Sequence, residues 1–145
     1  MPTDSECIFC KIIAGEIPCF SLREDSETLA FMDINPANRG HALVIPKQHW
    51  QDVYTIPDST IGAVGATARR IATAVRTALT PDGVNLVQAN GSGAAQSVLH
   101  FHMHVLPRFS GDDLKLNWGL KPGDMDEIKS TCERIKAVLA SVEVV

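Results

Sequence analysis

The sequence predicts one α+β domain, and three observations support this fold class. The chain has 145 residues, which suits a single domain that buries its core without disulfide bonds. Several short β-favouring runs alternate with turn residues, and two longer segments carry apolar residues at helical spacing. Hydrophobic residues make up 45% and charged residues 21%, an ordinary composition that excludes long disorder and a membrane protein.

Charge and the N-terminal segment limit the function further. A formal net charge of −4 argues against electrostatic binding to nucleic acid, which needs basic side chains. It leaves room for a small anionic ligand held by backbone amides and histidines. No stretch is long and apolar enough to span a bilayer, and residues 1–6 are polar and acidic, so we expect a cytoplasmic protein without a membrane partner.

The first third of the chain predicts a short helix, a hairpin and a third strand. A helix is expected where apolar residues precede a glycine, and a hairpin where two β-favouring runs flank a charged turn. A proline ends the third strand. These elements are the helix 7–13 before Gly15, the hairpin strands 20–23 and 28–34, and the strand 41–45 before Pro46.

The rest of the chain predicts two helices and two strands. A long helix is expected at 58–79, where apolar residues recur every three or four positions, with Asp58 or Ser59 as its N-cap. A final helix is expected at 124–140 on the same grounds. Strands at 84–88 and 98–106 lie between them, and the apolar helix faces are Ile61, Val64, Ala68, Ile71, Val75 and Ala78, then Met125, Ile128, Cys132, Ile135 and Leu139.

Three of the five histidines lie within five residues, at His100, His102 and His104. Side chains at i, i+2 and i+4 of a strand share a face, so the three imidazoles are expected to point the same way. Three structural histidines would each need a partner in one short segment, which favours a functional role. The row suits a metal site or a nucleophile with acid partners, and spacing does not decide between them. The preceding loop 90–97 has small residues whose amides suit phosphate oxygens.

Two of the four cysteines form a C-x-x-C pair, Cys7 and Cys10, while Cys19 and Cys132 stand alone. A secreted disulfide framework therefore fits poorly. The pair has the spacing of two zinc ligands. A redox-active dithiol is the competing interpretation, and no thioredoxin-like βαβ context supports it.

The sequence resembles the histidine triad family, whose motif of alternating histidines followed by two apolar residues is complete here. The resemblance covers most of the chain and is closest to the short bacterial branch. It implies an α+β antiparallel meander sheet with a central helix and a C-terminal helix, and a homodimer paired through the long helix and the sheet edges. The matching segments are CIFCKI at 7–12, AFMDI at 30–34, GHALVIPK at 40–47, QSV at 96–98, HFHMHVL at 100–106, and PR then GD at 107–112.

The resemblance implies a hydrolase or transferase that acts at the α-phosphate of nucleoside 5′-phosphoramidates or adenylyl conjugates. His102 would attack the phosphorus and form a nucleotidyl-histidine intermediate, which water then hydrolyses. His104 would stabilise or protonate the departing group. Ser97 matches a catalytic hydroxyl near the phosphate, and Asn90 matches a polar residue in the same region. Ser97, preceded by Gln96, favours the phosphoramidate branch.

The same resemblance implies a purine nucleotide or a nucleotide conjugate as the ligand. Asp33 matches a carboxylate that accepts hydrogen bonds from both ribose hydroxyls. Six apolar residues match the walls that sandwich the base. They are Ile8, Phe9, Ile12, Phe31, Ile34 and Leu43.

For a metal, the resemblance implies four ligands of a structural zinc ion, here Cys7, Cys10, His49 and His100. This site would anchor the N-terminal element to the catalytic strand and leave the other two triad histidines free. His41 matches a family histidine and is expected to be structural.

One residue departs from the family pattern, and three rival functions stay open. Ala95 stands where the family usually has glycine, so a positive φ is harder to reach there. A dinucleoside polyphosphate hydrolase would use the same triad on another leaving group. Intact His102 and His104 count against a nucleotide-binding regulatory module with weak turnover. A metalloenzyme that used all three histidines would leave the paired cysteines without a role.

Overall fold

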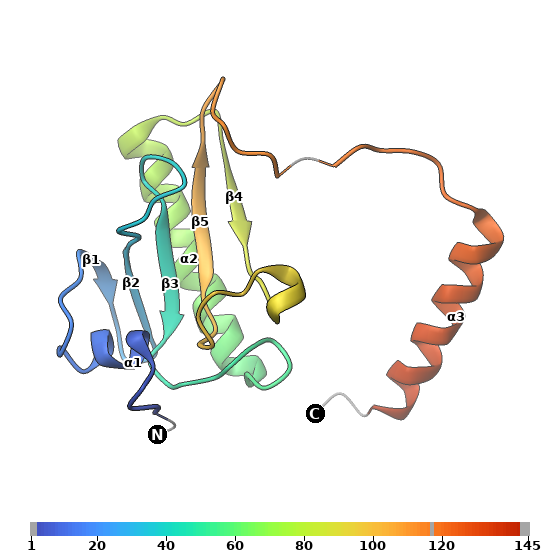
Figure 1. Cartoon of the computed structure of the whole chain (residues 1–145), viewed down its shortest axis with the longest axis horizontal. Helices are drawn as coiled ribbons and strands as arrows, with labels where there is room; N and C mark the ends of the chain where they lie inside the picture. The colour runs from blue at the N-terminus through green and yellow to red at the C-terminus, as the bar shows by residue number, and fades with distance from the viewer. Residues whose placement is uncertain (1–2, 117, 143–145) are drawn as a thin grey trace. The chain divides into compact units, whose positions relative to one another are not determined.

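The computed structural model describes residues 3–116 and 118–142. The chain divides into two compact units, Met1–Asp113 and Leu114–Val145. The first unit carries the sheet with two helices, and the second carries a third helix (Figure 1). This content confirms the predicted α+β class, whereas a single domain over the whole chain stays a prediction.

The first unit is built on a five-stranded antiparallel sheet in the order β1-β2-β3-β5-β4. β5 lies between β3 and β4, so His104 of β5 has Leu43 on one side and Val87 on the other. The elements are α1 (Ile8–Ile13), β1 (Ser21–Glu24), β2 (Thr28–Met32), β3 (Ala42–Pro46), α2 (Asp58–Leu79), β4 (Gly83–Val87), the 3₁₀ helix η1 (Ser92–Ala94) and β5 (Met103–Arg108).

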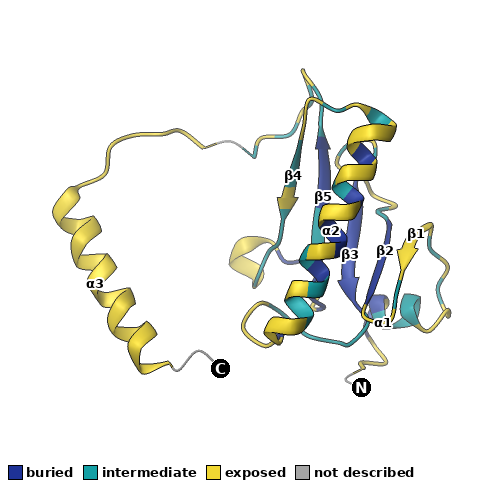
Figure 2. Ribbon diagram, turned by 180° about the vertical axis from the view of Figure 1, so that it is seen from behind, coloured by how far each residue is buried: buried dark blue, intermediate teal, exposed yellow. Residues whose placement is uncertain are grey.

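Both faces of the sheet are covered, because α2 packs on one face and α1 lies on the other, as Figures 1 and 2 show from opposite sides. Successive residues of β2 divide between two cores. Ala30 belongs to the core under α2, whereas Leu29 and Phe31 pack with Phe9 of α1. The period-two alternation of strand side chains therefore buries β2 from both sides.

The long helix has the bounds that the sequence predicts, and Val64, Ala68 and Val75 of its apolar face are buried. The prediction of its N-cap is wrong. Pro57 occupies that position with φ −67° and makes no side-chain cap hydrogen bond, and Asp58 is already the first helical residue. The proline side chain has no oxygen that could accept from the first amides of the helix, so this end has no side-chain cap.

The last strand is shorter at its start than the sequence predicts. It begins at Met103, so His100 and His102 lie in the irregular segment ahead of it and His104 lies in the strand. Pro46 explains the early end of the ladder, because proline has no N–H with which to continue it. The carbonyl oxygen of Pro46 instead accepts a hydrogen bond from Nε2–H of His100 at 2.9 Å.

The predicted alternation of side chains nevertheless holds across this segment. Phe101 and Val105 belong to the core under α2. The ring of Phe9 lies edge-on to His100 and His102, with centroid distances of 5.7 and 5.3 Å. These histidines therefore lie on the α1 face of the sheet.

The second unit consists of α3 (Met125–Ser141) and the residues that lead into it. Asp124 caps the helix by accepting a hydrogen bond from the amide of Glu127 at 2.9 Å. No described residue of α3 is buried, and Ile128 and Leu139 of its apolar face are 52% and 58% exposed (Figure 2). Among the helices of residues 3–116 and 118–142, none is long and apolar enough to cross a membrane.

Candidate active site and metal centre

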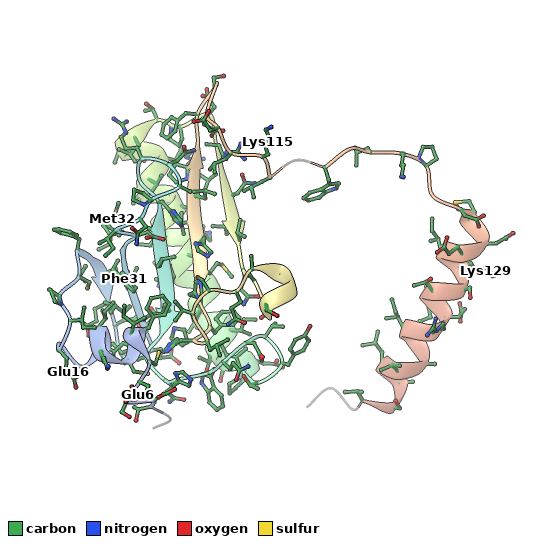
Figure 3. The ribbon with its side chains drawn as sticks, viewed as in Figure 1. Glu6, Glu16, Phe31, Met32, Lys115 and Lys129 are labelled. Atoms are coloured by element: carbon green, nitrogen blue, oxygen red, sulfur yellow. The ribbon has the colours of Figure 1, made fainter. Side chains whose placement is uncertain are left out.

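A cavity of about 390 Å³ opens on the α1 face of the sheet, which is the size of many small-molecule sites. All the predicted base-wall residues line it, together with Asp33, Ser97 and the last two triad histidines. Figure 3 labels two lining residues of β2, Phe31 and Met32. The full lining is Ile8, Phe9, Ile12, Ile17, Pro18, Cys19, Phe31, Met32, Asp33, Ile34, Asn35, Leu43, Ser97, Val98, His102 and His104.

The apolar part of the cavity has a buried floor and an exposed rim. Phe9 and Phe31 meet edge to face with ring centroids 5.7 Å apart, and both are buried beside Leu43. Ile8 and Ile34 are 47% and 75% exposed, so a ligand could cover them. A flat apolar group would fit between this floor and this rim.

His102 is buried, and one of its ring nitrogens has a firm partner. Its Nδ1 lies 2.7 Å from the carbonyl oxygen of His100. A carbonyl oxygen only accepts, so Nδ1 carries the proton and Nε2 keeps its lone pair. Burial lowers the pKa of His102 below its ordinary value, so the ring is neutral at pH 7.

His104 lies beside His102, with ring centroids 5.0 Å apart. Its Nδ1 is 2.8 Å from Nε2 of His41, and that Nε2 is 3.6 Å from a carboxylate oxygen of Asp33. Burial, with smaller effects from His102 and His41, lowers the pKa of His104 to about 4. Burial also lowers the pKa of His41, although Asp33 opposes that change.

The loop before the triad uses two predicted ligand residues for its own structure. Oε1 of Gln96 accepts from the amide of Gly91 at 2.8 Å, and its Nε2 donates to the carbonyl oxygen of Gln51 at 2.7 Å. Oδ1 of Asn90 accepts from the amide of Val53 at 2.8 Å. Neither Asn90 nor Gln96 lines the cavity, and their contact with a ligand stays a prediction.

Ala95 adopts the left-handed conformation that its side chain disfavours. Its φ is 61° and its ψ is 35°, at the C-terminal end of η1. The left-handed region costs an L-residue with a β-carbon about 1–2 kcal/mol. The loop therefore keeps the conformation of a glycine although the sequence supplies an alanine.

The four predicted metal ligands meet at one point. Their ligand atoms, from Cys7, Cys10, His49 and His100, all lie within 4.8 Å of one another. Nδ1 of His100 is 3.4 Å from Sγ of Cys7 and 3.7 Å from Sγ of Cys10, and Nδ1 of His49 is 3.4 Å from Sγ of Cys10. Tetrahedral zinc with ordinary bond lengths places sulfur and nitrogen ligands about 3.6 Å apart.

Groups behind these ligands fix their ring orientation. Nε2–H of His100 donates to the carbonyl oxygen of Pro46, which leaves Nδ1 with its lone pair directed at the cysteines. Nε2 of His49 is 4.0 Å from a carboxylate oxygen of Asp4. Outer partners of this kind are typical of metal-binding histidines, so the residues present fit a zinc ion.

The cavity also contains residues that the sequence did not predict. Met32, Asn35 and Val98 each neighbour a predicted residue in the chain and could have been found that way. Ile17, Pro18 and Cys19 follow Gly15, whose φ of 79° turns the chain after α1, and no sequence signal placed them here.

The antiparallel sheet between α1 and α2, and the row of histidines beside an apolar cavity, define a small α+β protein of the histidine triad class. The chain belongs to the HIT family, because the HIT domain profile matches residues 14–111. It is 43% identical over 131 residues to Protein hit of Bacillus subtilis, covering 86% of this chain and 90% of that protein. It is 37% identical over 132 residues to adenosine 5′-monophosphoramidase hnt1 of Schizosaccharomyces pombe, covering 90% and 96%.

Solved structures confirm the fold. SMU.412c from Streptococcus mutans UA159 matches with a TM-score of 0.91 at 34% identity, over 94% of this chain and 87% of that chain. A Zn-bound histidine triad family protein from Mycobacterium smegmatis matches with a TM-score of 0.73 at 38% identity, over 95% and 98%.

Proposed function

We propose that the chain hydrolyses nucleoside 5′-phosphoramidates or adenylyl conjugates at the α-phosphorus, with His102 as the nucleophile. The observation that carries this proposal is the hydrogen bond from Nδ1–H of His102 to the carbonyl oxygen of His100, which leaves Nε2 unprotonated in a residue that lines the cavity. A neutral imidazole with a free nitrogen is a competent nucleophile near pH 7. The relative named as an adenosine 5′-monophosphoramidase supports the substrate class.

The reaction consists of two displacements. In the first, Nε2 of His102 bonds to the α-phosphorus, the bond from phosphorus to the departing nitrogen or oxygen breaks, and the departing group gains a proton. In the second, water attacks the phosphorus and the bond to Nε2 breaks. The products are the nucleoside monophosphate, the released group and neutral His102, so a difficult single step becomes two easier ones.

The cavity offers a place for each part of such a substrate. The carboxylate of Asp33 would accept hydrogen bonds from the ribose hydroxyls, and its Oδ1 is held by the amide of Asn35 at 2.8 Å. The base would lie between the floor around Phe9 and the rim around Ile8. Ser97 is exposed at the cavity wall, where its hydroxyl can reach the phosphate or the departing group.

We also propose that Cys7, Cys10, His49 and His100 hold a structural Zn²⁺ ion. The distances between sulfur and nitrogen atoms and the outer partners of the histidines support it. Bound zinc would link the start of α1 to the loop after β3 and to the segment before β5, without taking part in the reaction. The residues that act on substrate remain His102 and His104.

The test of the function is hydrolysis of adenosine 5′-phosphoramidate and of a diadenosine polyphosphate, side by side, by the wild type and His102→Ala. We expect phosphoramidate turnover that His102→Ala abolishes while AMP binding persists. Preference for the dinucleotide would change the substrate class. Binding of AMP by a folded wild type that turns over neither compound would replace the enzyme with a nucleotide-binding module.

Two further parts of the proposal concern the setting of the protein. We propose a homodimer paired through α2 and the sheet edges, as the resemblance to the histidine triad family implies. A monomer in light scattering at high micromolar concentration would overturn it. We propose the cytoplasm as the location, because all four cysteines are free, as expected in a reducing compartment.

A further inference from the structure

A second group of polar side chains borders the cavity, formed by Asp33, His41 and His104, with ligand atoms within 4.8 Å of one another. The sequence assigned His41 a structural role, and the residue is only 6% exposed. Its Nε2 lies 2.8 Å from Nδ1 of His104. One of these nitrogens must donate and the other accept, and the direction decides what His104 can do.

The amide of Ala37 determines which nitrogen of His41 carries the proton. Its N–H points at Nδ1 of His41, with 3.0 Å between the nitrogens. A backbone amide only donates, so Nδ1 keeps its lone pair and the proton of the neutral ring sits on Nε2. The hydrogen bond between the two rings therefore runs from Nε2–H of His41 to Nδ1 of His104.

The same reasoning extends to His104. Because its Nδ1 accepts from His41, the proton of the neutral ring is on Nε2. Nε2 is then the ring nitrogen that remains for a ligand in the cavity that His104 lines. The lowered pKa values of both rings agree with neutral histidines at pH 7.

We propose that His41 is a positioning residue that holds His104 as a neutral Nε2–H donor, and that His104 binds the phosphate oxygens and is not a general acid. A charged His104 would carry a proton on Nδ1 that faces His41. His41 already accepts from Ala37, so it would have to give up its only ring proton. A buried anionic imidazole is far too unfavourable to exist at pH 7.

These hydrogen bonds also argue against a metal ion held by Asp33, His41 and His104. A metal at Nε2 of His41 would displace the proton that the ring needs while Nδ1 accepts from the amide. The facing nitrogens of the two histidines are 2.8 Å apart, whereas two nitrogen ligands of tetrahedral zinc lie about 3.3 Å apart. Asp33, His41 and His104 are therefore held by hydrogen bonds of fixed direction and not by a metal ion.

The fixed direction has a kinetic consequence. A general acid assists a poor leaving group more than a good one, because proton transfer matters most where the departing atom becomes most basic. A hydrogen-bond donor to the non-bridging phosphate oxygens assists poor and good leaving groups to a similar extent. The departing group would then take its proton from water. This catalytic part of the inference rests on the proposed function, whereas the tautomers do not.

The direct test is NMR of the purified full-length protein labelled with ¹⁵N-histidine, at pH 7. Long-range correlations between ring protons and nitrogens distinguish Nε2–H, Nδ1–H and doubly protonated rings. We expect both His41 and His104 as Nε2–H tautomers. An Nδ1–H or doubly protonated His104 in the wild type overturns the proposal, and this measurement needs no activity.

Two variants separate positioning from mere packing. His41→Gln keeps an amide N–H donor near the position of Nε2, and His41→Leu removes it. We expect His104 to stay in the Nε2–H form in H41Q and to lose this single form in H41L. We also expect kcat to be about tenfold lower in H41L than in H41Q at similar KM, the worth of one hydrogen bond. Equal kcat in both variants with unchanged His104 signals overturns the proposal.

A leaving-group series tests the catalytic part. The wild type and His104→Ala are compared on adenosine 5′-O-aryl phosphates whose phenols differ in pKa. We expect the same fold loss of kcat/KM in His104→Ala across the series. A loss that grows with the phenol pKa identifies a general acid and overturns the proposal. The wild type could cleave neither the aryl phosphates nor the phosphoramidate and still show the expected tautomers by NMR. In that case the proposed function fails, and the role of His41 in fixing the tautomer of His104 stands.

Discussion

Nδ1–H of His102 donates to the backbone oxygen of His100 at 2.7 Å, while the imidazole of His100 faces the two N-terminal cysteines. The group that orients the proposed nucleophile thus belongs to a proposed metal ligand. The carbonyl oxygen and the side chain of one residue therefore link the two sites. A disturbance of the metal centre is expected to reach His102 through this hydrogen bond and through the ring of Phe9, which contacts both histidines.

Replacing Cys10 by serine should remove the proposed zinc ion. Cys10 is within 3.7 Å of both histidine ligands, and serine is a poor zinc ligand. We expect zinc to fall from about one per chain to near zero and Tm to fall by about 5–10 °C, as for a loss of about 2–3 kcal/mol. Elemental analysis and calorimetry measure both quantities.

The matched control is Cys132→Ser, because Cys132 is exposed on α3 and is not among the proposed ligands. This variant should keep its zinc and its Tm. A full complement of zinc in the Cys10 variant would contradict the site.

Asp33→Asn should weaken binding of ribonucleotides. The asparagine keeps an oxygen for the amide of Asn35 but loses the charge that strengthens hydrogen bonds from the ribose hydroxyls. We expect Kd for AMP to rise about 10- to 100-fold. Calorimetry with AMP and with its 2′,3′-dideoxy analogue measures the effect. An equal loss of affinity for both ligands would show that Asp33 does not bind the ribose hydroxyls.

Ala95→Gly should stabilise the fold. At φ 61° the β-carbon is strained, and glycine removes this strain at some entropic cost in the unfolded chain. We expect the free energy of unfolding to rise by about 0.5 kcal/mol in urea titrations. Ala94→Gly, one residue earlier in η1, is the matched control and should lower the free energy of unfolding instead. Destabilisation by both changes would show that Ala95 is not strained.

Acid should destabilise the metal-free protein between pH 6.5 and pH 4. Burial lowers the pKa of His100 and of His104 to about 4, whereas unfolding returns both to an ordinary value near 6.5. In that window the unfolded chain binds more protons, so the free energy of unfolding falls as pH falls and is highest above pH 6.5. Urea midpoints in a chelating buffer measure this dependence.

His104→Asn supplies the comparison, because the variant has one buried neutral histidine fewer. The urea midpoint of this variant should fall less steeply than that of the wild type as the pH is lowered. Parallel curves for the two proteins would mean that His104 does not contribute.

The sequence by itself determined the elements whose signal is local. The 22-residue helix Asp58–Leu79 was predicted with its bounds, because apolar spacing over six turns reports one buried face. The histidine motif and the paired cysteines carried the resemblance to the triad family, and that resemblance implied the nucleophile and the four candidate metal ligands. These signals depend on residue type and spacing, which the chain carries before it folds.

The tertiary structure decided the features that depend on partners distant in the sequence. Pro46 stops the ladder beside β5 and binds the ring of His100, so the strand starts at Met103. Gln96 donates a hydrogen bond to the carbonyl oxygen of Gln51, 45 residues away, and does not line the cavity. The proton position of His104 depends on His41 and on a backbone amide that no motif indicates. Hydrogen-bond direction is set by the geometry of both partners, and only the folded chain brings those partners together.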